Sequence, residues 1–199
     1  MITRGFQGRR PPAEISGRIP PGQSLTTEFP VLSAGPTPEV DRETWSFTLK
    51  VGPKRVASWN WHEFNALPQT QVQADIHCVT KWSKLDTTWR GVSIDDLLSA
   101  AGGLVRTPFL LAHSYDGYST NVPTEDVVGG KAMIALSYAG EPLAPEHGGP
   151  ARLLVPHLYF WKSAKWVNAL QFTQRDEAGF WELRGYHMYG DPWREERYW

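Results

Sequence analysis

Short runs in which apolar and polar residues alternate are the feature that most limits the fold of this chain. Trp45–Val51 alternates cleanly, and Val72–Cys78 repeats the pattern with Ile76 and Cys78 on its apolar face. Alternation with a period of two is typical of strands that bury one face. The same reasoning predicts further strands at Phe109–His113, Lys131–Tyr138, Arg152–Val155, Lys165–Phe172 and Phe180–Arg184, with a tight hairpin at Ala139-Gly140.

Helix signals are few and local. Asn60 followed by Glu63 has the form of a capping box, and the helix that it opens should end before Pro68. Ser93 is a second N-cap, and it predicts a helix over Ile94–Ala101. The segment after Cys78, with its two tryptophans, is expected to be a loop. Strands outnumber helices without regular alternation, so the sequence predicts an α+β domain with mixed sheets and short helices.

The chain of 199 residues is the size of a single domain, predicted over residues 1–199. Residues 1–40 are poor in periodicity and predict an extended arm, which should dock on the body through Phe29-Pro30-Val31-Leu32. Pro11 and Pro12 follow Arg9-Arg10 where an export signal needs an apolar stretch. With no membrane span and a single cysteine, a cytoplasmic location is expected.

Composition and motifs exclude several function classes. A net charge of −1 gives no basic field for nucleic acid or an anionic membrane. The chain has no P-loop, no dinucleotide-binding glycine motif, no His-Glu-x-x-His, no Cys-x-x-Cys and no Gly-x-Ser-x-Gly. Two other segments remain as candidates for chemistry.

The first segment surrounds Cys78. A free cysteine on the apolar face of a strand is most often a core residue, and periodicity alone favours that interpretation. The other interpretation is a thiolate that binds a soft, redox-active metal. The 10 tryptophans of the chain fit either a Trp-rich core or a pocket lined by rings.

The second segment runs from Glu146 to Trp166. Gly148-Gly149 permits close approach of the backbone to a ligand, and Arg152 can hold an oxyanion at two points. Lys162 and Lys165 add charge, and Ser163 adds a hydroxyl donor. The lysines alone fit a solvated turn, but the whole set predicts an anion site.

Together the two segments resemble the sulfite oxidase family of molybdenum-cofactor enzymes. The motifs are Asp75-x-His77-Cys78-Val79-x-x-Trp82-Ser83, then His147-Gly148-Gly149-Pro150-x-Arg152, then Lys162-Ser163-x-Lys165-Trp166. The resemblance covers about Trp45 to Phe172. It is strongest to the small, stand-alone bacterial members, and the chain is also similar to the catalytic subunit of the protein-methionine-sulfoxide reductase.

The resemblance implies the family's molybdopterin-binding catalytic domain. It implies molybdenum on one pyranopterin dithiolene with a single phosphate, and Cys78 aligns with the cysteine that binds the metal. Positions expected to contact the cofactor are Phe29, Val31, Leu32, His113, His147, Arg152, Ser163, Ala164 and Lys165.

The resemblance also implies two-electron transfer of an oxygen atom to or from a small oxyanion or an S- or N-oxide. Tyr118, in the turn Asp116-Gly117-Tyr118, is a candidate proton donor near the metal, or part of an ordinary turn. No haem domain fits into this length, so a separate electron-transfer partner is expected. From Trp45 to Arg106 the chain has only the arginines Arg55, Arg90 and Arg106 itself. Such a small number argues against sulfite as the substrate.

Two alternatives stay open. One is a cofactor-free thiol enzyme that uses Cys78 with His77 or His113 as the base. His77 should point to the opposite face of its strand, which weakens that pair. The other alternative is a non-catalytic module that keeps the fold but has lost the metal.

Overall fold

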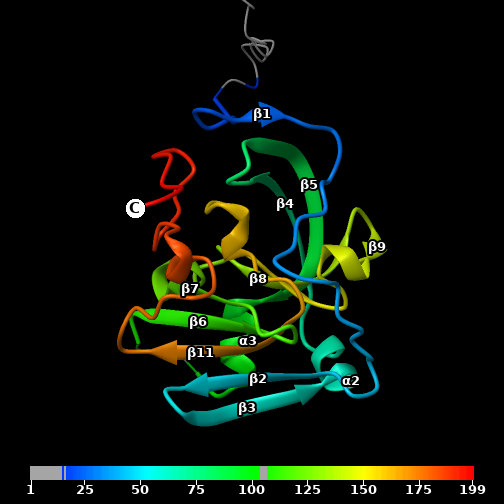
Figure 1. Cartoon of the computed structure of the whole chain (residues 1–199). Coiled ribbons are helices and arrows are strands. Elements are labelled where there is room, and N and C mark those ends of the chain that lie inside the picture. Colours follow the sequence, from blue (N-terminus) through cyan, green and yellow to red (C-terminus); the bar gives the residue numbers. More distant parts are fainter. Residues whose placement is uncertain (1–14, 16, 104–106) are drawn as a thin grey trace, which may run out of the picture.

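The computed structural model describes residues 15, 17–103 and 107–199, so Arg9, Arg10 and Arg106 lie outside the described residues. Two sheets form the body, and Figure 1 shows one of them at the base of the view. This five-stranded sheet has the order β3-β2-β11-β6-β7. Its strands are β2 (Ser46–Val51), β3 (Lys54–Asn60), β6 (Phe109–Ser114), β7 (Ser119–Pro123) and β11 (Val167–Thr173).

The second sheet is built around one long strand, β5. Its path is β1-β5-β8-β10, with β4 also paired to β5 and β9 paired to β8. In Figure 1 the β4–β5 hairpin rises from the base, with β1 beside its far end. The strands are β1 (Ser24–Leu25), β4 (Thr70–His77), β5 (Trp82–Ser93), β8 (Met133–Tyr138), β9 (Glu141–Pro142) and β10 (Arg152–Leu154).

The mixed sheets and short helices confirm the predicted fold class. Helix α2 (Trp61–Asn65) begins at the predicted capping box, in which the Asn60 side chain accepts from the Glu63 N–H and the Glu63 carboxylate accepts from the Asn60 N–H. Helix α3 (Ile94–Ala100) begins after Ser93, whose hydroxyl accepts from the Asp96 N–H. The β8–β9 hairpin turns at Ala139-Gly140, where both residues have positive φ as a tight hairpin requires.

Two sequence-based expectations are wrong. Phe180–Arg184 is not a strand: it is a turn followed by the 3₁₀ helix η4 (Glu182–Arg184). The segment with Trp82 and Trp89 is not a loop but the strand β5. Polar residues interrupt the apolar alternation of β5, since this strand bends and pairs with three different partners along its length.

The main core lies between the five-stranded sheet and the elements packed against it, which are α2, α3 and parts of β5, β8 and β10. Trp45, Phe47 and Leu49 pack with Phe64 of α2 in one buried cluster, which also contains Leu98 of α3. A smaller cluster on the other sheet contains Ile76, Trp89 and Phe160. Among the described residues no helix has the length and hydropathy of a membrane span.

Between these parts the chain forms loops and three further 3₁₀ helices: η1 (Thr124–Asp126), η2 (Pro145–His147) and η3 (Phe160–Lys162). Figure 1 shows the N-terminal arm running down one side of β5 and the C-terminal segment lying on the opposite side of the molecule. Residues of the arm, of the segments around η2 and η3 and of the C-terminal segment line one cavity.

Candidate active site

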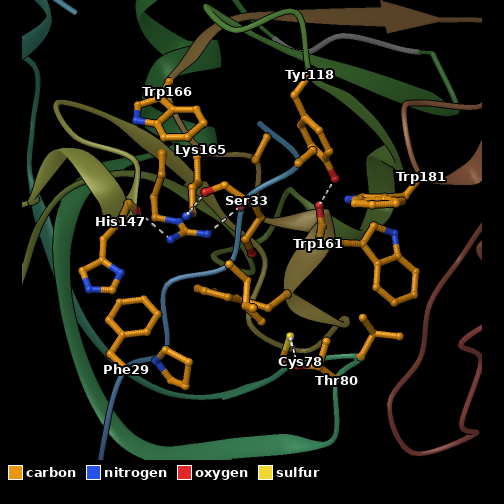
Figure 2. Close-up of a pocket in the computed structure, with 18 of the residues that line it drawn as sticks. Phe29, Ser33, Cys78, Thr80, Tyr118, His147, Trp161, Lys165, Trp166 and Trp181 are labelled. Carbon is orange, nitrogen blue, oxygen red and sulfur yellow. Dashed lines mark hydrogen bonds between the residues drawn. The ribbon is translucent and has the colours of Figure 1, made fainter. Parts of the chain in front are cut away.

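A cavity of about 280 Å³ lies between the arm, the turn after β4, and the segments around η2 and η3. Figure 2 shows Phe29, His147 and Lys165 on one side, Trp161 and Trp181 on the other, and Cys78 with Thr80 below them. Most of the residues predicted as site residues line this cavity: Phe29, Leu32, Cys78, Tyr118, His147, Arg152, Ser163, Ala164 and Lys165. Val31 and His113 do not line it.

Cys78 lies at the start of a tight turn that joins β4 to β5. Its N–H donates to the Trp82 carbonyl at 2.8 Å, and its carbonyl accepts from the Lys81 N–H at 3.0 Å. Gln23 of the arm also donates to the Cys78 carbonyl, at 2.9 Å. The Cys78 residue is 7% exposed, and its thiol accepts a hydrogen bond from the Thr80 hydroxyl at 3.2 Å. Burial raises the pKa of the Cys78 thiol, so without a metal it stays protonated at neutral pH.

The structure does not pair Cys78 with a histidine base. His77 is the last residue of β4, and its Nδ1 is 2.8 Å from the Ser83 hydroxyl of β5. His113 lies on β6 in the other sheet, where its Nε2 is 3.0 Å from Oε1 of Gln171. A nucleophilic cysteine needs a base within hydrogen-bonding reach. Among the described residues the Cys78 thiol has only the Thr80 hydroxyl as a side-chain partner.

Arg152 is the main charge in the cavity and is 1% exposed. Its Nη1 donates to the His147 carbonyl and its Nη2 to the Ser163 carbonyl, both at 2.7 Å, while its buried Nε has no partner in the described structure. The guanidinium lies over the Phe160 ring, 4.2 Å from its centroid. Burial lowers the pKa of Arg152, but the group is still a cation at neutral pH. A buried cation without a counterion is costly unless an anion joins it.

Lys165 is a second cation on the same side. Its Nζ donates to the Ser33 hydroxyl at 2.8 Å and to the Glu146 carbonyl at 2.6 Å. Burial and the neighbouring Arg152 lower the pKa of Lys165 to about 8, and Asp116 and Glu146 oppose this shift more weakly. Neither Lys165 nor Arg152 forms an ion pair with an acidic residue in the described part of the chain.

Backbone hydrogen bonds hold the segment after η3 against β10. The Ser163 hydroxyl accepts from the Val155 N–H at 2.9 Å, and the Ala164 carbonyl accepts from the Leu153 N–H at 2.9 Å. The Ser163 hydroxyl oxygen therefore accepts this internal hydrogen bond, and the hydroxyl proton can be donated to a ligand. Ala164 has no side-chain polar group, so it can only contact a ligand through its backbone or methyl group.

The glycines and Lys162 have other roles than the sequence suggested. A Cβ on Gly148 would lie 3.0 Å from the Lys165 backbone, and a Cβ on Gly149 would lie 2.1 Å from the Leu143 carbonyl oxygen. The close approach at Gly148-Gly149 is therefore between parts of the chain itself. Lys162 is fully buried, does not line the cavity, and pairs with Glu182 at 2.6 Å.

The arm covers the cationic side of the cavity. Phe29 stacks on the His147 ring, with centroids 4.0 Å apart and planes 8° apart. Val31 and Leu32 are half exposed, so the docking predicted for the arm rests on Phe29 in this patch. Burial and the two cations lower the pKa of His147, whose Nδ1 is buried without a partner in the described structure.

Tyr118 lies in the predicted turn between β6 and β7. Its hydroxyl donates to the Trp161 carbonyl at 2.7 Å, as Figure 2 shows. Burial and the Glu182 carboxylate raise the pKa of Tyr118 well above its usual value, so the group keeps its proton. In this arrangement the proton is already used to hold Trp161.

Sequence reasoning missed one whole wall of the cavity. This wall comes from three separate places in the chain, and its rings are Trp161, Trp181 and Tyr186, with Val79 and Thr80 beside them. The Trp161 and Tyr186 rings meet edge to face at 5.2 Å, and Trp181 lies 4.9 Å from Tyr186. The tryptophan count was the available signal, but it does not say which rings meet.

One cavity thus contains a buried thiol, an aromatic wall and two cations that have no acidic partner among the described residues. Residues 34–181 match the family described as "Oxidoreductase molybdopterin binding domain", and the chain belongs to this family. It is therefore a molybdopterin-dependent oxidoreductase of the sulfite oxidase-like type.

Individual relatives agree with this assignment. The chain is 41% identical over 194 residues to "Uncharacterized oxidoreductase YuiH" of Bacillus subtilis strain 168, covering 97% of this chain and 98% of that protein. It is 28% identical to the putative protein-methionine-sulfoxide reductase subunit YedZ1 of Azospira oryzae, covering 86% of this chain and 66% of that one. The sulfane dehydrogenase SoxCD of Paracoccus pantotrophus shares the fold, with a TM-score of 0.60 and 22% identity over 70% of this chain and 40% of that chain.

Proposed function

We propose that this cavity binds molybdenum on one pyranopterin dithiolene, with the Cys78 thiolate as the protein ligand, and catalyses oxygen-atom transfer on a small S- or N-oxide or oxyanion. The observation that carries the proposal is the placement of Cys78 in the same cavity as Arg152 and Lys165. A soft thiolate suits a redox-active metal, and two unpaired cations suit the cofactor's phosphate.

The residues present fit this group. The unpartnered Nε of Arg152 and the unpartnered Nδ1 of His147 are buried polar atoms on the cationic side, where an anionic ligand would satisfy them. Arg152 and Lys165 would hold the phosphate, and Phe29 with His147 would cover the pterin. Metal binding would deprotonate Cys78, whose pKa burial raises, and the shielding by aromatic rings would keep water out. Bound molybdenum supplies the two-electron change that no side chain here can provide.

The charges of the cavity favour an S- or N-oxide over sulfite. Arg55 and Arg90 are exposed on β3 and β5 and do not line the cavity, which leaves Arg152 and Lys165 as its lysine and arginine side chains among the described residues. Both lie on the side that we assign to the phosphate. The name of the similar YedZ1 protein, a putative protein-methionine-sulfoxide reductase subunit, supports the same choice.

No haem is part of the proposed site, so electrons would pass to or from a separate partner protein. The single cysteine is compatible with a reducing compartment, and we place the enzyme in the cytoplasm. Fractionation of cells that express the chain tests that location: recovery in the periplasmic or membrane fraction would contradict it.

Metal and pterin analysis tests the proposal. Protein purified from a host that makes the cofactor should contain about one molybdenum and one pterin per chain. Cys78→Ser should reduce turnover of a sulfoxide with a dye electron donor at least about a hundredfold, because a direct ligand matters more than the groups around it.

Thr80→Val is the matched control for this substitution. It removes the hydroxyl that donates to the thiol at 3.2 Å but leaves the sulfur in place. This variant should keep its molybdenum and most of its activity. Wild-type protein without molybdenum, or Cys78→Ser with full activity, would end the proposal.

A further inference from the structure

Glu182, in η4, is a buried carboxylate that the proposed reaction does not use. One of its oxygens, Oε1, accepts three hydrogen bonds. The donors are Thr120 Oγ1 at 3.0 Å, Trp161 Nε1 at 2.9 Å and Lys162 Nζ at 2.6 Å. Both side chains of the Lys162–Glu182 ion pair are fully buried.

Lys162 joins the same point to further segments. Its Nζ lies within hydrogen-bonding distance of the Asn121 carbonyl, the Asn121 side-chain oxygen and the Met188 carbonyl, at 3.0, 2.7 and 2.6 Å. These groups belong to β7 and to the C-terminal segment. The ion pair therefore connects β7, η3, η4 and the C-terminal segment at one buried point.

Several further contacts fix the position of Trp161. Its backbone carbonyl accepts from the Tyr118 hydroxyl, and its ring stacks on Tyr159 with centroids 5.3 Å apart. A Cβ on Gly190 would lie 2.8 Å from the ring, so only glycine permits this contact. The ring lines the cavity and packs in the same cluster as Cys78, and Figure 2 shows it on the same side of the cavity as Trp181.

A buried ion pair is a poor way to gain stability. Two charges lose their hydration when they are buried, and apolar residues of similar volume are often as stable in the same place. What the carboxylate adds here is direction, because it is a strong acceptor that fixes the indole N–H and hence the plane of the ring.

We propose that Glu182 and Lys162 are positioning residues, which hold the Trp161 indole as a rigid wall of the cavity beside Cys78 and thereby limit the size of the substrate that reaches it. The inference deepens the proposed function and rests on it for the identity of the substrate. The positioning itself depends only on residues of this chain.

Two double variants separate the charges from the hydrogen bond. K162M/E182Q removes both charges but keeps an amide oxygen that can accept from the indole. K162M/E182L also removes this acceptor. Both variants remove the Lys162 ammonium, so its former acceptors lose the same donor in each. K162M/E182Q is therefore the matched control for K162M/E182L. W161F, which keeps a smaller ring and has no N–H, serves if the double variants do not fold.

The first measurement is exchange of the Trp161 indole proton by NMR, with its signal assigned by its absence in W161F. The indole should be protected in wild type and in K162M/E182Q. In K162M/E182L its exchange should be roughly ten to a hundred times faster, the factor expected for loss of a hydrogen bond to a charged group. Equal protection in wild type and K162M/E182L would overturn the positioning role.

The second measurement is size selectivity of the molybdenum-loaded enzyme. The probe is the kcat/KM for methyl phenyl sulfoxide divided by that for dimethyl sulfoxide. This ratio should rise about tenfold in K162M/E182L and in W161F, because a hydrophobic pocket discriminates by about this factor per group excluded. It should stay within twofold of wild type in K162M/E182Q. A ratio that is unchanged in both K162M/E182L and W161F would overturn the size limit.

Alkylation of the metal-free protein gives a readout that does not need turnover. Cys78 is the single cysteine, so the rates with iodoacetamide and with the bulkier N-phenylmaleimide report access to it alone. The bulky-to-small ratio of rates should rise in K162M/E182L and W161F but not in K162M/E182Q. If loaded wild type reduces neither sulfoxide, the proposed substrate class fails, and the alkylation ratio still decides whether Trp161 limits access.

Discussion

Arg152 and Lys165 are the residues whose charges decide what this cavity can bind. Each donates hydrogen bonds to backbone carbonyls, which fix the position of its charged group. Neither has a carboxylate partner in the described structure. Cations that are held in place and not neutralised by a carboxylate are suited to binding a phosphate or a sulfate ester. Lys165 adds a dependence on pH, because burial and Arg152 lower its pKa to about 8.

Anion binding by the metal-free protein should therefore weaken as pH rises through about 8. A lowered lysine pKa means that the cation is lost at a lower pH than in a free lysine, so its attraction is present below pH 8 and absent above it. Sulfate is the suitable probe, since its charge is constant here. Calorimetry at pH 7 and pH 8.5 should give about a threefold loss of affinity, because most of the Lys165 charge is lost over this interval while burial lowers the pKa of Arg152 only to about 9.

Lys165→Arg is the control for this pH dependence. A guanidinium keeps its charge at pH 8.5, so this variant should lose much less affinity than wild type over the same range. An equal loss in both proteins would assign the titration to another group.

Which site residues the sequence could predict follows from how they are spaced. Arg152 stands in one short motif and Ser163 with Lys165 in the next, so a resemblance over these two stretches was enough to predict them. Trp161, Trp181 and Tyr186 reach the cavity through packing between distant segments, and no local pattern encodes that. His113 was predicted from a weak local match on β6, and the structure places it in the other sheet, away from the cavity lining.

At the scale of elements, β5 determines where the cavity lies. Its first residues pair with β1 and β4 beside the Cys78 turn, and its last residues pair with β8. The register of the β5–β8 pair shifts between Arg90 and Gly91, where β4 is also paired with β5. A Cβ on Gly91 would lie 2.0 Å from the Ile134 carbonyl oxygen of β8.

Gly91→Ala should consequently destabilise the whole protein. The added methyl group meets backbone that cannot move without breaking the β5–β8 ladder, so we expect a loss of about 3 kcal/mol in the free energy of unfolding. Gly35→Ala is the control, since nothing lies within 4 Å of its added Cβ. Urea unfolding of both variants checks this, and equal midpoints for them would contradict it.

The elements that sequence predicted well are those with local signals. Asn60 and Ser93 set the starts of both helices through hydrogen bonds to residues three positions away, which a sequence displays directly. Phe180–Arg184 was misread because its aromatic residues look like a buried strand. Trp181 instead faces the cavity, and Glu182 turns inward to Lys162, so tertiary contacts determine this segment.

At the scale of the molecule, the arm fastens the cavity to the second sheet. Arg18 pairs with Asp75 and Asp86 at the β4–β5 hairpin, and Lys84 donates to the Thr27 carbonyl. Farther along, Phe29 stacks on His147 and also meets Trp89 of β5 edge to face at 5.9 Å. One ion pair is exposed and the other is only part-buried, so both add little and the aromatic contacts should carry most of the docking energy.

Phe29→Ala should loosen the arm and the cavity together. We expect a loss of about 2 kcal/mol in unfolding free energy, because the side chain is only partly buried, and faster loss of cofactor on dilution. Leu25→Ala, at a residue that is 48% exposed, is the control and should change neither. Thermal unfolding and pterin fluorescence after dialysis measure the two effects; an unchanged Phe29→Ala would show that the arm is held elsewhere.

The aromatic wall has a consequence for how such an enzyme is made in the cell. Trp181 and Tyr186 lie near the end of the chain, and the hydroxyl-bearing Tyr198 ring packs against Tyr186 at 5.1 Å. A chain that emerges from the ribosome in order from its N-terminus would present Cys78 and Arg152 long before this wall exists. The cavity is therefore complete only after Trp181 and Tyr186 have been synthesised and packed, and a group that binds the complete cavity would enter after them.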